Sequence, residues 1–116
     1  FPVKLDKILI IMTYHDSVWT HVNREKMNQS IFKALSNGGI YGILDHHAKS
    51  GRGIDDCHSI HRIEKEFVVN EVLRAGFDFE DESDLLENPD DNLTDMVFEK
   101  HIRDRTSRFL LRFKKP

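Results

Sequence analysis

The sequence predicts an α/β fold in which strands and helices alternate along 116 residues. Apolar runs of strand length alternate with segments whose apolar residues recur at helical spacing. Turns rich in glycine, proline and asparagine separate these segments. The predicted order is β-α-β-α-β-loop-β, and its length fits one domain over residues 1–116.

The first strand is predicted at residues 7–12, where an apolar run shows no alternation. Such a run is typical of a central parallel strand that is covered on both faces. A helix is predicted for residues 24–36, because Met27, Ile31 and Leu35 share one face. Residues 37–39, Asn-Gly-Gly, are expected to end this helix.

The second strand is predicted at residues 40–44. A right-handed crossover would make it the parallel neighbour of the first strand. Residues 48–56 contain two glycines and are expected to form a mobile loop. A long helix should follow, with its buried side running from Ile60 to Leu73 and its end at Gly76.

The third strand is predicted around Phe77 and Phe79, which alternate with polar residues. Residues 88–92 are typical of a turn, and residues 108–113 form the last strand candidate. Since no helix is predicted between these two strands, we expect them to be antiparallel. The core is predicted from residues on the apolar faces: Ile31, Leu35, Phe67, Val68, Leu73 and Phe109.

Composition excludes several classes of protein. The net charge is -3 and the basic residues are interleaved with acids, so we expect no nucleic-acid partner. Cys57 is the single cysteine, which excludes an internal disulfide and a multi-cysteine zinc site. The longest apolar run, residues 8–12, is too short to span a membrane, so we expect a soluble protein. The chain begins with Phe1 close to a strand, which indicates a piece cut from a longer protein.

Polar sequences follow the two parallel strands. Tyr14-His15-Asp16 follows the first strand and Asp45-His46 follows the second, while His61-Arg62-Ile63-Glu64 precedes the long helix. Together with residues 82–89 and 102–113, their order and spacing resemble the second half of the seven-stranded class I S-adenosylmethionine-dependent methyltransferases. The similarity is greatest to a bacterial group of predicted methyltransferases that carry a Tyr-His-Asp turn.

This resemblance implies the C-terminal half of a Rossmann-like methyltransferase domain, whose N-terminal, cofactor-binding half is absent. In the intact protein it implies methyl transfer from S-adenosylmethionine to a small-molecule acceptor. The glycine-rich turn that holds the cofactor in this family is missing, and residues 51–53 do not replace it. We therefore expect this chain to be inactive alone. The compartment stays open, cytoplasmic or periplasmic if the protein is bacterial.

The catalytic candidates are His15, Asp16, Asp45 and His46, because the carboxyl ends of parallel strands form the ligand-binding edge of an open α/β sheet. A hydroxyl or amine acceptor needs a base to take its proton, and His15 is the first candidate. Asp16 or Asp45 could orient this histidine. Equally, Asp16 could cap a helix and Asp45 could bind loop amides.

The cofactor-binding candidates are Thr13, Tyr14 and Trp19, and the substrate-binding candidates are His61, Arg62 and Arg103. The rings of Tyr14 and Trp19 could line an adenine or acceptor pocket, although both residues could equally serve packing. The arginines could bind a carboxylate or form ordinary ion pairs.

The histidines also have spacings that a metal site can use. His46, His47, His58 and His61 belong to two nearby segments that could together bind a metal ion. The protein would then be a His/Asp metallohydrolase, which requires stoichiometric metal. Seven histidines in 116 residues produce such spacings by chance, so we expect no metal site.

The alternative to an enzyme is a non-catalytic α/β module that serves association. In either case the apolar edge from Ile8 to Met12 leaves backbone groups unpaired, which invites another chain. We therefore expect a homodimer, or strand exchange, through this edge.

Overall fold

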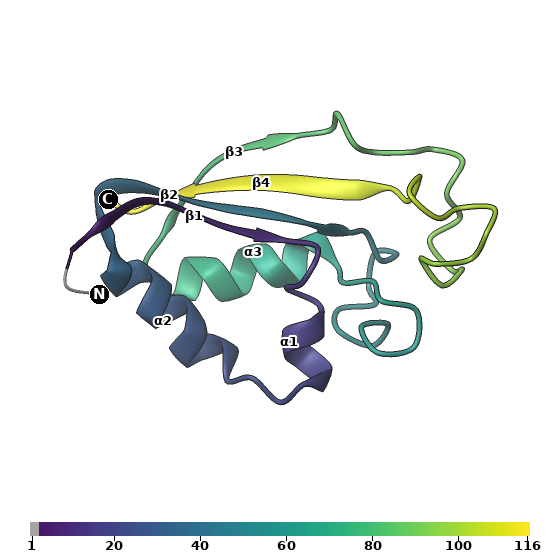
Figure 1. Ribbon diagram of the computed structural model, residues 1–116, viewed down its shortest axis with the longest axis horizontal. Helices are drawn as coiled ribbons and strands as arrows, with labels where there is room; N and C mark the ends of the chain where they lie inside the picture. Colours follow the sequence, from purple (N-terminus) through teal and green to yellow (C-terminus); the bar gives the residue numbers. More distant parts are fainter. Residues whose placement is uncertain (1–2) are drawn as a thin grey trace.

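The computed structural model describes residues 3–116 as one sheet with helices packed beneath it (Figure 1). The elements in chain order are β1 (Leu5–Ile11), α1 (Asp16–Trp19), α2 (Arg24–Ala34), β2 (Leu35–His46), α3 (Lys65–Arg74), β3 (Asp78–Ser83) and β4 (Arg108–Lys114). This order confirms the predicted alternation, with the short helix α1 added after β1.

The sheet has four strands in the order β1-β2-β4-β3. β1 and β2 are parallel, whereas β4 runs antiparallel to both β2 and β3. Both predicted directions are therefore confirmed. Because β1 and β2 are parallel, their carboxyl ends lie at the same edge of the sheet, where the polar sequences begin.

The helices α2 and α3 lie against one face of the sheet (Figure 1). The buried core between these layers includes Leu35, Tyr41, Ile43, Val68, Val72 and Phe113. Leu73, which the pattern assigned to the core, is 40% exposed, because it lies on the outer side of α3. Within residues 3–116, none of the helices has the length and apolar character that crossing a membrane requires.

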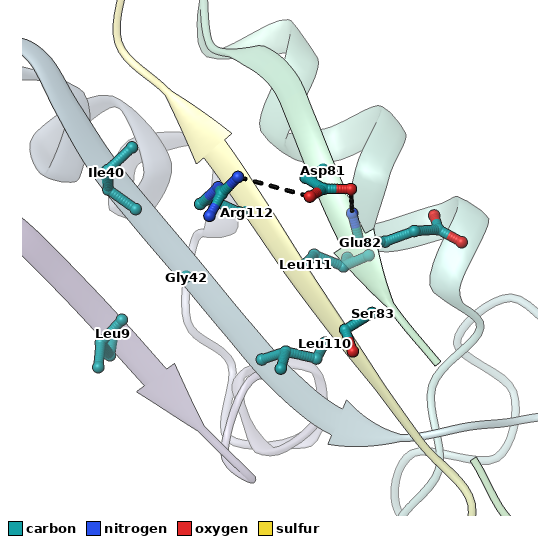
Figure 2. Close-up of a pocket in the computed structure, with 9 residues that line it drawn as sticks. All are labelled: Leu9, Ile40, Gly42, Asp81, Glu82, Ser83, Leu110, Leu111 and Arg112. Atoms are coloured by element: carbon teal, nitrogen blue, oxygen red, sulfur yellow. Dashed lines mark hydrogen bonds and ion pairs between the residues drawn. The ribbon is translucent and has the colours of Figure 1, made fainter. Parts of the chain in front are cut away.

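Within residues 3–116 no helix covers the other face of the sheet, so β1 is not covered on both faces as the apolar run predicted. Leu9 and Ile11 are 61% and 56% exposed, and β1 is an edge strand. A cavity of about 240 Å³ lies on this face. Its lining residues include Leu9, Ile40 and Leu110 (Figure 2). Arg112 and Asp81 form an ion pair at 3.4 Å on its far side (Figure 2).

The helix α2 ends two residues earlier than predicted, and β2 is longer. Leu35 pairs with Leu5, whereas Ile40 pairs with Lys7, so residues 36–39 form a bulge in β2. Gly38 adopts a φ of 80°, and its N–H donates to the carbonyl of Lys115. The two glycines therefore shape a bulge inside the strand rather than ending a helix.

The long predicted helix is shorter at its start, because Ile63 is extended rather than helical. The N–H of Ile63 donates to the carbonyl of His46, and the carbonyl of Ile63 accepts the N–H of Ala48. Ile63 therefore forms a short parallel bridge with His47, next to the end of β2. The preceding segment, residues 49–61, consists of turns. The carboxylate of Glu64 accepts the N–H groups of Gly51 and Gly53 at 2.9 Å each, which fixes this segment against the start of α3.

Candidate functional site

A cavity of about 260 Å³ lies at the carboxyl ends of β1 and β2. Five residues selected from the sequence line it: His15, Asp16, His46, His61 and Arg103. The remaining lining residues are Met12, Val97, Phe98, Asp104 and Arg108. The segment after β1, the end of β2, the turn before α3 and the connection before β4 therefore meet at one place. The order of elements predicted only that the first two meet.

His15 is held by the buried carboxylate of Asp45. The backbone N–H of His15 donates to Oδ2 of Asp45 and its ring Nδ1 donates to Oδ1, both at 2.8 Å. His15 is 4% exposed and Asp45 is fully buried. Asp45 also accepts the N–H of His46 at 2.8 Å, so it fixes the positions of both His15 and His46. These contacts place the Nε2 atom of His15 on the side away from Asp45.

Two opposing effects set the pKa of His15. Burial lowers it, but the hydrogen bond and charge of Asp45, together with the charge of Asp16, outweigh burial and raise it above its ordinary value. A raised pKa makes the ring a stronger proton acceptor, which suits a general base.

Asp16 lies on the open side of His15. Its Oδ1 atom is 3.1 Å from Nε2 of His15 and accepts the indole N–H of Trp19 at the same distance. The Asp16 side chain is 34% exposed, so it lies on the solvent side of His15. As the first residue of α1, Asp16 also places a negative charge at a helix start.

His46 differs from His15 in its surroundings. Its Nδ1 atom is 2.6 Å from the hydroxyl of Thr106. Burial lowers the pKa of His46 to about 4, although the charge of Asp45 acts in the opposite direction. The site therefore contains two neighbouring histidines whose pKa values are shifted in opposite directions, which is typical of sites that divide proton-transfer roles.

His61 approaches His15 from the turn before α3. Its Nδ1 is 3.9 Å from Oδ1 of Asp16, and its ring lies 5.4 Å from the ring of His15. His61 has a φ of 60°, a left-handed conformation that is uncommon outside glycine. Burial and the charge of His15 lower the pKa of His61.

The two arginines selected from the sequence occupy different environments. Arg62 is fully buried and forms two hydrogen bonds to Asp91, at 2.8 and 2.9 Å. The structure therefore does not bring Arg62 to the cavity. Arg103 does line it, as does Arg108, which the sequence reasoning assigned only to a strand. The register of β2 and β4, which pairs His46 with Arg108, is the information that was missing.

The three residues selected for cofactor binding do not lie together. Tyr14 is 1% exposed, and its hydroxyl bonds to Glu71 and Asn28 in the layer between sheet and helices. Trp19 is 37% exposed and stacks on His58 at 5.1 Å between ring centroids. Thr13 is exposed, and none of the three lines the cavity. Within residues 3–116 these residues do not form a complete site for S-adenosylmethionine, so we derive no step through that cofactor.

One group of side chains could hold a metal ion. His15, Asp16 and His61 offer ligand atoms that all lie within 4.8 Å of one another. The other spacings considered for metal do not contribute to this group. His58 stacks on Trp19, and His47 lies 3.2 Å from Glu87.

Comparison with solved structures identifies the class of fold. The chain is similar to an S-adenosylmethionine-dependent methyltransferase from Mesorhizobium loti, with a TM-score of 0.58 and 16% identity over 97% of this chain and 62% of that one. It is similar to the [4+2]-cyclase SpnF, with a TM-score of 0.64 and 14% identity over 97% of this chain and 50% of that one. It is also similar to the pyocyanin biosynthetic protein PhzM, with a TM-score of 0.57 and 13% identity over 99% of this chain and 32% of that one.

The chain thus has the α/β fold of these proteins and spans between 32% and 62% of their lengths. No protein-family model and no curated protein matches the sequence. Since one structure is a methyltransferase and another a cyclase, the shared fold does not define one reaction.

Proposed function

We propose that this chain forms the acceptor side of an S-adenosylmethionine-dependent methyltransferase that acts on a small molecule. The proposal assigns the binding of the methyl donor to sequence outside this chain. Support comes from the fold shared with the Mesorhizobium loti methyltransferase and from the resemblance of the polar sequences after β1 and β2.

The observation that carries the proposal is the pair of His15 and Asp45 at the carboxyl ends of two parallel strands. Asp45 fixes the ring of His15 through Nδ1 and leaves Nε2 for a ligand in the cavity. This arrangement is suited to removing a proton from a hydroxyl while the acceptor stays in a fixed position.

In this mechanism the acceptor hydroxyl replaces Asp16 as the partner of Nε2. His15 takes the proton, and Asp45 stabilises the imidazolium that forms. The low pKa of His46 keeps that ring neutral at pH 7, so it can accept or donate a hydrogen bond without adding a charge beside His15. S-adenosylmethionine would supply the electrophilic methyl group.

Calorimetric titration of S-adenosylhomocysteine tests the proposal, because this product binds without turnover. It should be added to this chain and to a longer protein that contains the chain. We expect binding by the longer protein alone. Binding by neither would instead support the non-catalytic association module, and binding by this chain alone would contradict our placement of the donor site.

The group of His15, Asp16 and His61 favours a second candidate, a metal-dependent hydrolase. This candidate requires a stoichiometric metal ion. Metal analysis after purification without chelator decides it, with His61→Ala as the variant that should lose the metal and His101→Ala as the control. His101 also lies beside an aspartate, Asp95, at 2.8 Å, but outside the cavity.

A further inference from the structure

Two arginines line the cavity without a carboxylate partner. Arg103 lies in the segment before β4, and Arg108 is the first residue of β4. Among residues 3–116, neither guanidinium forms an ion pair, whereas Arg62 and Arg112 both do. The Nε atom of Arg108 donates to the hydroxyl of Thr106 at 3.2 Å, which leaves its outer nitrogens for another partner.

The acids of the cavity do not neutralise these arginines. Oδ1 of Asp16 already contacts His15 and Trp19. Asp104 follows Arg103 directly but forms no ion pair with either arginine in the described residues. The side of the cavity near β4 is therefore suited to an anion that can bind two guanidinium groups, which a carboxylate does well.

Part of the lining of the cavity is apolar and aromatic. Phe98 is 57% exposed although it lines the cavity, and its ring lies 5.5 Å from the ring of His61. Val97 also lines the cavity and is almost fully buried. An exposed aromatic ring beside a second ring offers a surface on which a flat molecule can pack. At about 260 Å³ the cavity is smaller than most ligand pockets, which favours a single-ring ligand.

We infer that the cavity binds a monocyclic aromatic carboxylate, with Arg103 and Arg108 binding the carboxylate and Phe98 packing against the ring. A hydroxyl on the same ring is then the group presented to His15, so the methyl acceptor belongs to the hydroxybenzoate class. That last step rests on the proposed function, whereas binding of the aromatic carboxylate does not.

Calorimetric titration of this chain with 4-hydroxybenzoate, without any methyl donor, tests the inference. The neutral 4-hydroxybenzamide has nearly the same shape, and inorganic phosphate supplies an anion without a ring. We expect 4-hydroxybenzoate to bind at least about tenfold more tightly than either, since hydrogen bonds to charged groups contribute more than neutral ones. Equal affinity for the acid and the amide, or no binding of the acid, would overturn the inference. Tighter binding of phosphate than of 4-hydroxybenzoate would overturn the aromatic part of the inference and leave a site for simple anions.

Variants locate the site. Arg103→Gln and Arg108→Gln should each weaken binding of 4-hydroxybenzoate by about tenfold or more and leave the amide unaffected. The control is Arg105→Gln, which removes an exposed arginine of the same segment that does not line the cavity. An equal loss in this control would contradict the assignment. If the acid binds as expected but a longer protein does not transfer methyl groups, the proposed function fails and the carboxylate site remains.

Discussion

Burial lowers the pKa of His15, but the hydrogen bond and charge of Asp45, together with the charge of Asp16, outweigh burial and raise it. Asp45→Asn keeps the size of the side chain but removes its charge. We expect the pKa of His15 to fall, because only the charge of Asp16 then opposes the effect of burial. An NMR pH titration of the His15 ring in chelator-treated protein measures this change. Asp95→Asn, beside the exposed His101, is the control and should leave His15 unchanged.

The same substitution should change how stability depends on pH. In the native chain the pKa of His15 is raised, so protonated His15 stabilises the fold below the unfolded pKa of about 6.5. This contribution is lost as the pH rises through the folded pKa. His46 acts in the opposite direction, because its pKa of about 4 makes stability increase between about pH 4 and 6.5. Unfolding by urea at several pH values should show that Asp45→Asn reduces the decrease above pH 6.5, and an unchanged profile would contradict the assignment.

At the scale of elements, Arg62 joins the turn before α3 to the long connection between β3 and β4. Its guanidinium binds the carboxylate of Asp91 and the carbonyls of His47 and Asp95. Asp91 in turn accepts the N–H of Ser107 at 2.7 Å, next to β4. This buried pair therefore fixes the segments that carry His61 and Arg103 into the cavity.

Removal of one member of this pair should be costly. Arg62→Met leaves the Asp91 carboxylate buried without a cation, and we expect a loss of about 3–5 kcal/mol in the free energy of unfolding, measured in urea. Asp91→Asn added to Arg62→Met removes that charge and should recover part of the loss. Arg52→Met is the control and should have a much smaller effect, because the pair of Arg52 and Asp56 is half-exposed. A similar loss in both single variants would contradict this role.

The elements themselves could largely be predicted from the sequence, because they depend on local apolar spacing. β1, α2, α3 and β4 appear where the apolar residues recur, and the crossover rule predicted the parallel pair. The exceptions depended on contacts between distant residues. Ile63 has a helical spacing but pairs with His47, and the glycines after α2 serve the register between β1 and β2.

The candidate site could be predicted only in part, for the same reason. The two sequences after parallel strands place His15, Asp16 and His46 together without further information. Tyr14 follows the same strand, yet its side chain is buried in the core, because the chain turns toward α1 at this point and the N–H of Ser17 donates to the carbonyl of Tyr14. Placing Arg108 in the site requires the register between β2 and β4, which the sequence does not give. Predicting that Arg62 is buried requires its contact with Asp91, which is 29 residues away in the chain.

At the scale of the whole molecule, the open face and the free edge of β1 belong to the same strand. Leu9 and Ile11 point to the uncovered face, and β1 pairs only with β2 among residues 3–116. A flat apolar edge with unpaired backbone groups favours addition of another strand. We therefore expect this chain to form dimers through β1, by edge pairing or by strand exchange.

Light scattering coupled to gel filtration measures this association over a range of concentrations. Leu9→Lys should shift the chain toward monomer, because burying an ammonium group in the paired edge and its apolar face is unfavourable. Leu85→Lys is the matched control, since Leu85 is 80% exposed but lies beyond the end of β3. Its dimer fraction should equal that of the unmodified chain. If the unmodified chain is a monodisperse monomer at every concentration, the edge of β1 does not drive association. Leu9 and Ile11 would then remain exposed to water in the monomer.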